Sequence, residues 1–261
     1  MDGIPGKPWP KNFPEVSTLA DYKAMKENPF YVAAKTGNNE AAVNLIQSLI
    51  SNENKIFLSI GEKYPDAVLL GIHAEEREGK NKIPQVLVEY MGKITGLEVD
   101  KEILQSNIVS HTGAGQNVRL FARPEFDGNV QSGRDYILVD DMITMGGTMG
   151  ELRHYIESRG GNVVSMISLS TRHESNRTIA QRDETKLDLQ KTFGVKSLGG
   201  EYDMTPLNDF LKESGLYGGN YEALTESEAR ALIHIKTLDE ARNRRTSAGQ
   251  ARDVSLRQQE V

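Results

Sequence analysis

Short apolar runs and amphipathic stretches alternate along the middle of the chain. Continuous apolar runs predict buried strands at 66–72, 136–139 and 162–170. A shorter run at 107–110 is a further strand candidate. Helical stretches are predicted around and between them, at 39–50, 85–95, 149–159, 174–191 and 206–213. Because alternating strands and helices form parallel sheets, the pattern predicts an α/β fold, with a mostly parallel twisted sheet and helices on both faces.

The two ends of the chain differ in character from its middle. Residues 1–32 are proline-rich and irregular, and we expect an N-terminal segment or hood there. Residues 33–215 carry the alternating elements and are predicted to form the main domain. Residues 216–261 begin with a glycine-containing linker and are predicted to hold a C-terminal helix and a tail.

The C-terminal helix has a clear start signal. Thr225 and Glu228 have the spacing of a capping box, which predicts a helix running to about Arg244. Residues 245–261 are polar and are predicted to be disordered. The helix packs either on its own domain or on a partner, such as a second subunit, and the expected assembly is a homodimer.

Composition narrows the class of protein. The chain has 261 residues, a net charge of −6 and no cysteine, so it can bury a core, has no broad basic surface and forms no disulfides. The arginine-rich tail could touch nucleic acid, but the overall acidity argues against strong binding. No apolar run reaches the length of a membrane span, and the N-terminus lacks the pattern of a signal peptide. A cytoplasmic protein is therefore expected.

One short stretch carries candidate chemistry. The apolar run at 136–139 stops at Asp140 and Asp141, and the turn at 144–148 leads into the helix predicted at 149–159. Parallel α/β sheets bind ligands at the carboxyl ends of their strands. A glycine-rich turn that opens a helix offers backbone N–H groups and a positive dipole end to a phosphate. The plainer alternative is a strand-to-helix turn whose acids face water.

This stretch resembles the phosphoribosyl pyrophosphate (PRPP) loop of type I phosphoribosyltransferases. The family pattern is four apolar residues, two acids, two variable residues and a threonine-glycine turn, and Met145 stands where the family usually has threonine. The resemblance implies that Asp140 and Asp141 accept hydrogen bonds from the ribose hydroxyls. It also implies that a turn holds the 5′-phosphate, with the residues Thr144, Met145, Gly146, Gly147 and Thr148.

The family likeness also implies a fold with a small hood and a reaction. Phosphoribose would pass from PRPP to a nitrogen acceptor with release of pyrophosphate. Mg²⁺ would be held mainly by PRPP and water, with at most a carboxylate from Asp140 or Asp141, so no dedicated metal cluster is expected. The 6-oxopurine enzymes carry an acid where this chain has Thr144, so the acceptor is not expected to be a 6-oxopurine.

A looser likeness to the competence-type (ComF-like) branch covers further residues. It implies pyrophosphate contacts from His73 and Arg77 and a flexible loop that carries Arg119 and Arg123. The proline that usually precedes the histidine is missing, and the two acids at 75–76 add negative charge near a negative ligand. Each arginine has a plain alternative as a solvated surface residue.

Two functions stay open at this point. The first is an Mg²⁺- and PRPP-dependent transferase with an unknown acceptor. The second is a non-catalytic regulatory or accessory protein that senses PRPP or a nucleotide, because a fold does not determine a function. The competence-type likeness adds a role in DNA uptake or transfer as a further option.

Overall fold

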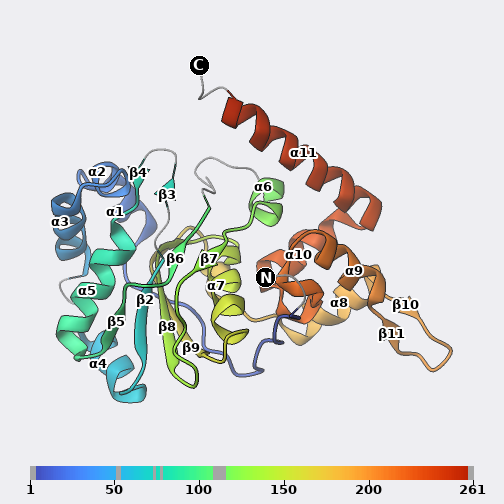
Figure 1. Cartoon of the computed structure of the whole chain (residues 1–261), viewed down its shortest axis with the longest axis horizontal. Helices are drawn as coiled ribbons and strands as arrows, with labels where there is room; N and C mark the ends of the chain where they lie inside the picture. Colours follow the sequence, from blue (N-terminus) through green and yellow to red (C-terminus); the bar gives the residue numbers. More distant parts are fainter. Residues whose placement is uncertain (1–3, 51–53, 73–74, 77–78, 108–115, 258–261) are drawn as a thin grey trace.

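A five-stranded parallel sheet forms the centre of the protein. The computed structural model describes residues 4–50, 54–72, 75–76, 79–107 and 116–257. Its strands run in the order β1-β9-β8-β2-β5, and every neighbouring pair is parallel (Figure 1). Their bounds are β1 Ser17–Thr18, β2 Val68–Gly71, β5 Glu98–Asp100, β8 Asp135–Ile143 and β9 Asn162–Thr171. The predicted fold class is confirmed.

Helices cover both faces of this sheet, because β8 and its neighbours are apolar on both sides. Ile137 and Val139 point into one cluster of buried residues, and Tyr136 and Leu138 into another, as the two-residue period of a strand requires. The first cluster is closed by α3 (Asn39–Ile50), α4 (Asn54–Lys63) and α5 (Ile83–Thr95). The second is closed by α7 (Gly147–Glu157).

A third cluster of buried residues joins the C-terminal helices. It includes Leu189, Leu207, Phe210 and Leu232, and we call it the C-terminal helical cluster. Its C-terminal helices lie beyond α7 in Figure 1 and are α8 (Asp183–Phe193), α9 (Thr205–Glu213), α10 (Glu226–Ile235) and α11 (Leu238–Arg257). The short helix α6 (Gln116–Phe121) adds Leu120 to the cluster. The C-terminal helix therefore packs on its own chain, which was one of the two alternatives.

Short elements make up the remaining regular structure. These are α1 Tyr22–Glu27, α2 Tyr31–Lys35, the antiparallel pairs β3 Glu75–Glu76 with β4 Gly79–Lys80, β6 Leu104–Gln105 with β7 Phe126–Asp127 and β10 Val195–Lys196 with β11 Tyr202–Asp203, and the 3₁₀ turns at Glu174–Arg177, Tyr217–Gly219 and Tyr221–Ala223.

Several predicted boundaries need correction. The helix predicted at 174–191 is a 3₁₀ turn followed, after a break, by α8. The helix expected from Thr225 to Arg244 ends at Ile235, because Lys236 has a φ of 73°, and Thr237 then caps a new helix by accepting from the Glu240 N–H. This helix, α11, continues to Arg257, so residues 245–257 are helical rather than disordered. The strand candidate at 107–110 lies mostly outside the described residues.

The N-terminal residues link the sheet to the C-terminal helical cluster. We call residues 6–18 the N-terminal strap. The Gly6 N–H donates to the Tyr217 carbonyl at 2.8 Å, and the Trp9 indole N–H donates to the Leu224 carbonyl at 2.8 Å. Arg153 of α7 lies 4.1 Å from the centre of the Trp9 ring. At its far end the strap enters the sheet as β1, beside β9.

Candidate functional site

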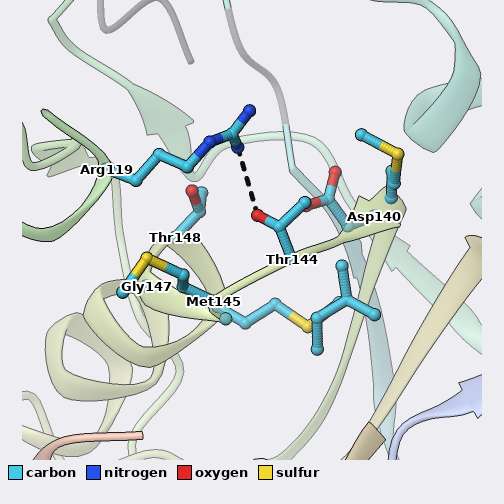
Figure 2. Close-up of a pocket in the computed structure, with 10 residues that line it drawn as sticks. Arg119, Asp140, Thr144, Met145, Gly147 and Thr148 are labelled. Carbon is cyan, nitrogen blue, oxygen red and sulfur yellow. Dashed lines mark hydrogen bonds between the residues drawn. The ribbon is translucent and has the colours of Figure 1, made fainter. Parts of the chain in front are cut away.

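A pocket opens where the central strands separate. The chain leaves β2 toward β5 and leaves β8 toward β9 on the other side, so β2 and β8 flank a switch point of the sheet, where such folds bind ligands. The pocket at the end of β8 encloses about 340 Å³ including its open mouth (Figure 2). Apart from Arg119, all the residues that line the pocket come from the end of β8, the turn that follows it and the start of α7. They are Asp140, Met142, Ile143, Thr144, Met145, Gly146, Gly147, Thr148 and Met149.

The turn that lines the pocket has the form of an anion site. Gly146 is the N-cap of α7, has a φ of 77° and has no side chain with which to cap the helix. The N–H groups of the first turn therefore lack a capping side chain at this position, and the positive end of the helix dipole faces the pocket. A Cβ on Gly146 would lie 3.1 Å from Ile179, and one on Gly147 would overlap Arg123 and Glu228, so glycine at both positions lets the turn pack closely against the side chains behind it.

Arg119 places a positive charge over the turn. It extends from α6, and its Nη1 donates to the Thr144 hydroxyl at 3.2 Å (Figure 2). A guanidinium, a helix N-terminus and the hydroxyls of Thr144 and Thr148 therefore surround the same space. This set of donors suits a phosphate.

The two acids occupy different surroundings. Asp140 lines the pocket, whereas Asp141 does not line it and is only 4% exposed. A carboxylate oxygen of Asp141 accepts from the Lys35 ammonium at 2.8 Å, and Asn81 also donates to this carboxylate. Of the two acids that were expected to face a sugar, only Asp140 lines the pocket.

These surroundings separate the acidities of the pair. Burial, and then the charge of Asp141, raises the pKa of Asp140 well above its usual range. Burial acts in the same direction on Asp141, but the charge of Lys35 and the hydrogen bonds with Lys35, Asp140 and Asn81 together outweigh it and lower the pKa of Asp141. The pair therefore holds a proton on Asp140 more firmly than an exposed carboxyl would.

Arg123 lies behind the turn instead of in a loop over the pocket. Arg123 is 9% exposed, and its guanidinium forms an ion pair with Glu228 of α10, with 2.5 Å between Nη1 and Oε1. Glu151 of α7 lies 3.8 Å from Nε of this arginine, and Tyr217 donates to Glu228 at 2.8 Å. Because the partners are buried with it, Arg123 is fixed where a mobile loop was predicted.

The same cluster perturbs Glu151. Burial raises the pKa of Glu151 to about 8, Arg123 acts against this rise, and the nearby Glu228 carboxylate adds to it. Two acids thus share one arginine in a space closed to water. A cluster of this kind has a charge state that changes near neutral pH.

Other predicted site residues lie elsewhere or are not described. His73 and Arg77, assigned to pyrophosphate, lie outside the described residues. Lys35, Asn81 and Thr225 also contact the candidate site, although the sequence identified Thr225 only as a helix cap. Among the described residues, no group of three or more His, Cys, Asp or Glu side chains is placed to hold a metal ion.

Comparison with curated proteins finds relatives at moderate identity. The chain is 36% identical to Protein TraN of Escherichia coli over 243 residues, which make up 92% of this chain and 51% of that protein. It is 36% identical to an uncharacterized protein of Haemophilus influenzae over 152 residues, or 57% of this chain and 33% of that protein. The chain therefore spans about half the length, or less, of these curated relatives. No family model matches it.

Comparison with solved structures finds partial alignments, at low identity, with phosphoribosyltransferases. An adenine phosphoribosyltransferase aligns with a TM-score of 0.33 and 12% identity, over 56% of this chain and 73% of that one. The UMP synthase of Leishmania donovani aligns with a TM-score of 0.31 and 16% identity, over 69% of this chain and 32% of that one. The orotate phosphoribosyltransferase of Mycobacterium tuberculosis aligns with a TM-score of 0.29 and 12% identity, over 53% of this chain and 77% of that one. Likeness at this level says nothing about activity, and the competence-type branch stays a hypothesis.

No helix in the described part of the chain combines the length and the apolar character needed to cross a membrane.

Proposed function

We propose that this pocket binds PRPP together with Mg²⁺, and that the protein transfers phosphoribose to a nitrogen acceptor with release of pyrophosphate. One observation carries the proposal. An aspartate, a threonine-glycine turn at a helix N-terminus and an arginine converge on a single pocket at the switch point of a parallel sheet.

The phosphate end of the pocket accounts for the first part of the ligand. A phosphate monoester carries close to two negative charges at neutral pH and several acceptor oxygens. The first turn of α7 offers backbone N–H groups, Thr144 and Thr148 offer hydroxyls, and Arg119 offers a guanidinium. These donors match the charge and the acceptors of a 5′-phosphate.

Asp140 accounts for the sugar and the cation. As a hard oxygen donor at the pocket wall, it suits a ribose hydroxyl or Mg²⁺, which prefers carboxylates, phosphate oxygens and water. The donor set thus fits magnesium brought in by the ligand. When bound, the ion would neutralise charge on the departing pyrophosphate. Because the pKa of Asp140 is raised, a cation or a hydroxyl donor at its carboxylate is expected to displace a proton.

A second function, PRPP binding without turnover, is favoured by Asp141. Its carboxylate is held by Lys35 and Asn81, so the pocket offers one acid where the family resemblance implies two. With fewer groups to stabilise the developing positive charge on the ribose, the same pocket could bind its ligand and release it unchanged.

Calorimetric titration with PRPP and Mg²⁺ tests the site itself. Asp140→Asn is expected to weaken binding at least about tenfold, because a charge-assisted contact is lost. Asp135→Asn is the matched control, since Asp135 lies at the other end of β8, where it accepts from Asn162. Equal affinity of all three proteins, or no binding by the wild type, would contradict the proposed site.

Turnover needs a separate assay. Purified protein is incubated with PRPP, Mg²⁺ and a panel of pyrimidine and purine bases, and pyrophosphate release is measured. Release that depends on one base and is lost in Asp140→Asn supports the transferase. Binding of PRPP without release under any base supports the sensing function.

A further inference from the structure

The back of the phosphate turn is held by the C-terminal helical cluster. The Thr225 hydroxyl donates to the Met145 carbonyl at 2.7 Å, across 80 residues of sequence. A methyl group of Thr225 also lies 3.4 Å from the position that a Cβ on Gly146 would take. The N-terminus of α10 therefore rests directly against the turn, on the side away from the pocket.

This contact determines which way a backbone amide points. The structure contains no cis peptide bond among the described residues, so the Met145–Gly146 peptide is trans and planar. In a trans peptide the C=O and the following N–H point in opposite directions. With the Met145 carbonyl turned back toward Thr225, the Gly146 N–H points the other way, and Gly146 lines the pocket.

The turn by itself does not dictate this orientation. Gly146 has φ 77° and ψ 3°, the values of the third residue of a type II turn. A type I turn differs mainly by rotation of the central peptide and needs φ near −90° at the same position, which glycine adopts as readily. A contact from outside the turn must therefore favour one state, and Thr225 supplies it.

The surroundings of Thr225 leave its hydroxyl proton a single acceptor. Its oxygen accepts from the Glu228 N–H at 3.2 Å, while the Glu228 carboxylate accepts from the Thr225 N–H at 2.9 Å. Thr225 and Glu228 are both 0% exposed, and Glu228 is paired with Arg123. A hydroxyl has a single proton to donate, and with water excluded the Met145 carbonyl receives it.

We infer that Thr225 is a positioning residue of the phosphate site: it holds the Met145–Gly146 peptide so that the Gly146 N–H faces the bound phosphate. The inference rests on the proposed function, because it concerns the same pocket. Thr225 does not touch the ligand. It acts through the backbone of the turn and so makes phosphate affinity depend on the docking of α10.

The test compares two substitutions at one position. Thr225→Val keeps the shape and removes the hydroxyl, whereas Thr225→Ser keeps the hydroxyl. Calorimetry with PRPP and Mg²⁺, and with inorganic phosphate alone, is expected to give at least about tenfold weaker binding for the valine variant and near wild-type binding for the serine variant. Loss of both ligands in parallel would place the defect at the phosphate end.

A matched control removes the effect of a weakened helix cap. Thr225→Val also removes the N-cap of α10, so Thr237→Val serves as control, because Thr237 caps α11 in the same cluster and is exposed. It is expected to lower thermal stability through the lost cap and to leave phosphate affinity unchanged. Equal loss of affinity in both valine variants would overturn the inference.

A measurement on the wild-type protein keeps the inference testable if the valine variant does not fold. In protein labelled with ¹⁵N-glycine, the Gly146 amide signal is expected to shift on titration with phosphate. A Gly146 signal that stays in place while that of Gly147 moves would overturn the inference and leave the proposed function intact. Absence of any PRPP or phosphate binding by the wild type would overturn both.

Discussion

Neighbouring residues of the same type take opposite roles in this site. Asp140 faces the pocket and keeps a raised pKa, while Asp141 is turned toward Lys35 and has a lowered one. The lysine, which lies 106 residues earlier in the chain, makes this difference. A pair of acids read as equivalent in the sequence is thus one candidate ligand group and one buried ion-pair partner.

Removal of Lys35 is expected to destabilise the protein. Lys35→Met leaves a buried carboxylate without its counter-ion, which costs about 3 kcal/mol of unfolding free energy. Because the folded-state pKa of Asp141 is lowered, the stabilisation is present at neutral pH and is lost as the pH falls below the ordinary carboxyl range. Urea denaturation at pH 7 measures the loss. The double variant Lys35→Met/Asp141→Asn should recover most of it, and no recovery would contradict this account.

Glu151 predicts a pH dependence of the opposite sign. Its folded-state pKa of about 8 lies above the ordinary value of 4.5, so the folded protein holds a proton that the unfolded chain has lost between these values. Stability is expected to fall through this window by ~1.4 kcal/mol per pH unit at most, and to level off above it. Glu151→Gln should remove this slope. Denaturation of both proteins at pH 5, 7 and 9 measures the difference, and parallel curves would count against a buried proton on Glu151.

At the scale of elements, the strand and helix that form the pocket follow from local sequence. The β8 apolar run and the glycine turn before α7 are contiguous, so their order and their chemistry are readable without a structure. The end of β8 is not. The strand continues through both acids to Ile143 because β9 runs beside it, with Ser168, Ser170 and Thr171 as register partners of its last residues. Pairing between distant segments decides that boundary.

Side chains behind the pocket were beyond prediction for the same reason. Thr225 was identified only as a helix cap and Arg123 only as a loop residue. Each owes its place near the turn to the docking of helices that are distant in sequence. The part of the site that one segment encodes could therefore be predicted, and the part that packing assembles could not.

Two glycines in helices should respond oppositely to the same substitution. A Cβ on Gly150 of α7 would overlap the Tyr217 hydroxyl and lie 3.1 Å from its ring carbon Cζ, so Gly150→Ala is expected to cost about 2 kcal/mol. A Cβ on Gly249 of α11 meets nothing within 4 Å, so Gly249→Ala should stabilise by up to about 1 kcal/mol through helix propensity. Thermal unfolding of the two variants measures both effects. A stabilising Gly150→Ala would mean that α7 does not approach Tyr217 this closely.

On the scale of the whole molecule, the three buried clusters are joined by long-range contacts rather than by a linker. The N-terminal strap bonds to residues 217 and 224 before it enters the sheet (Figure 1). Thr225, the N-cap of α10, bonds to the turn after β8. The sheet and the C-terminal helical cluster therefore share contacts at both ends of the chain. Such an arrangement favours unfolding as one cooperative unit.

The single tryptophan of the chain makes this testable. Trp9 donates to the Leu224 carbonyl and contacts Arg153, so its fluorescence reports the docking of the strap. Urea transitions followed by tryptophan fluorescence and by far-UV circular dichroism are expected to coincide. An earlier fluorescence transition would show that the strap detaches before the sheet unfolds.

The position of Thr225 bears on how this chain can be divided. A fragment ending at residue 215, the boundary suggested by composition, would contain every residue from Asp140 to Thr148 and lack the hydroxyl that orients their backbone. The same cut would uncover the apolar residues of α9 that pack against the 3₁₀ turns at Tyr217–Gly219 and Tyr221–Ala223 and against α11. Truncation or fusion at this point, or grafting of the loop into another scaffold, would keep the recognisable sequence motif and lose the Thr225 contact that supports the turn from behind.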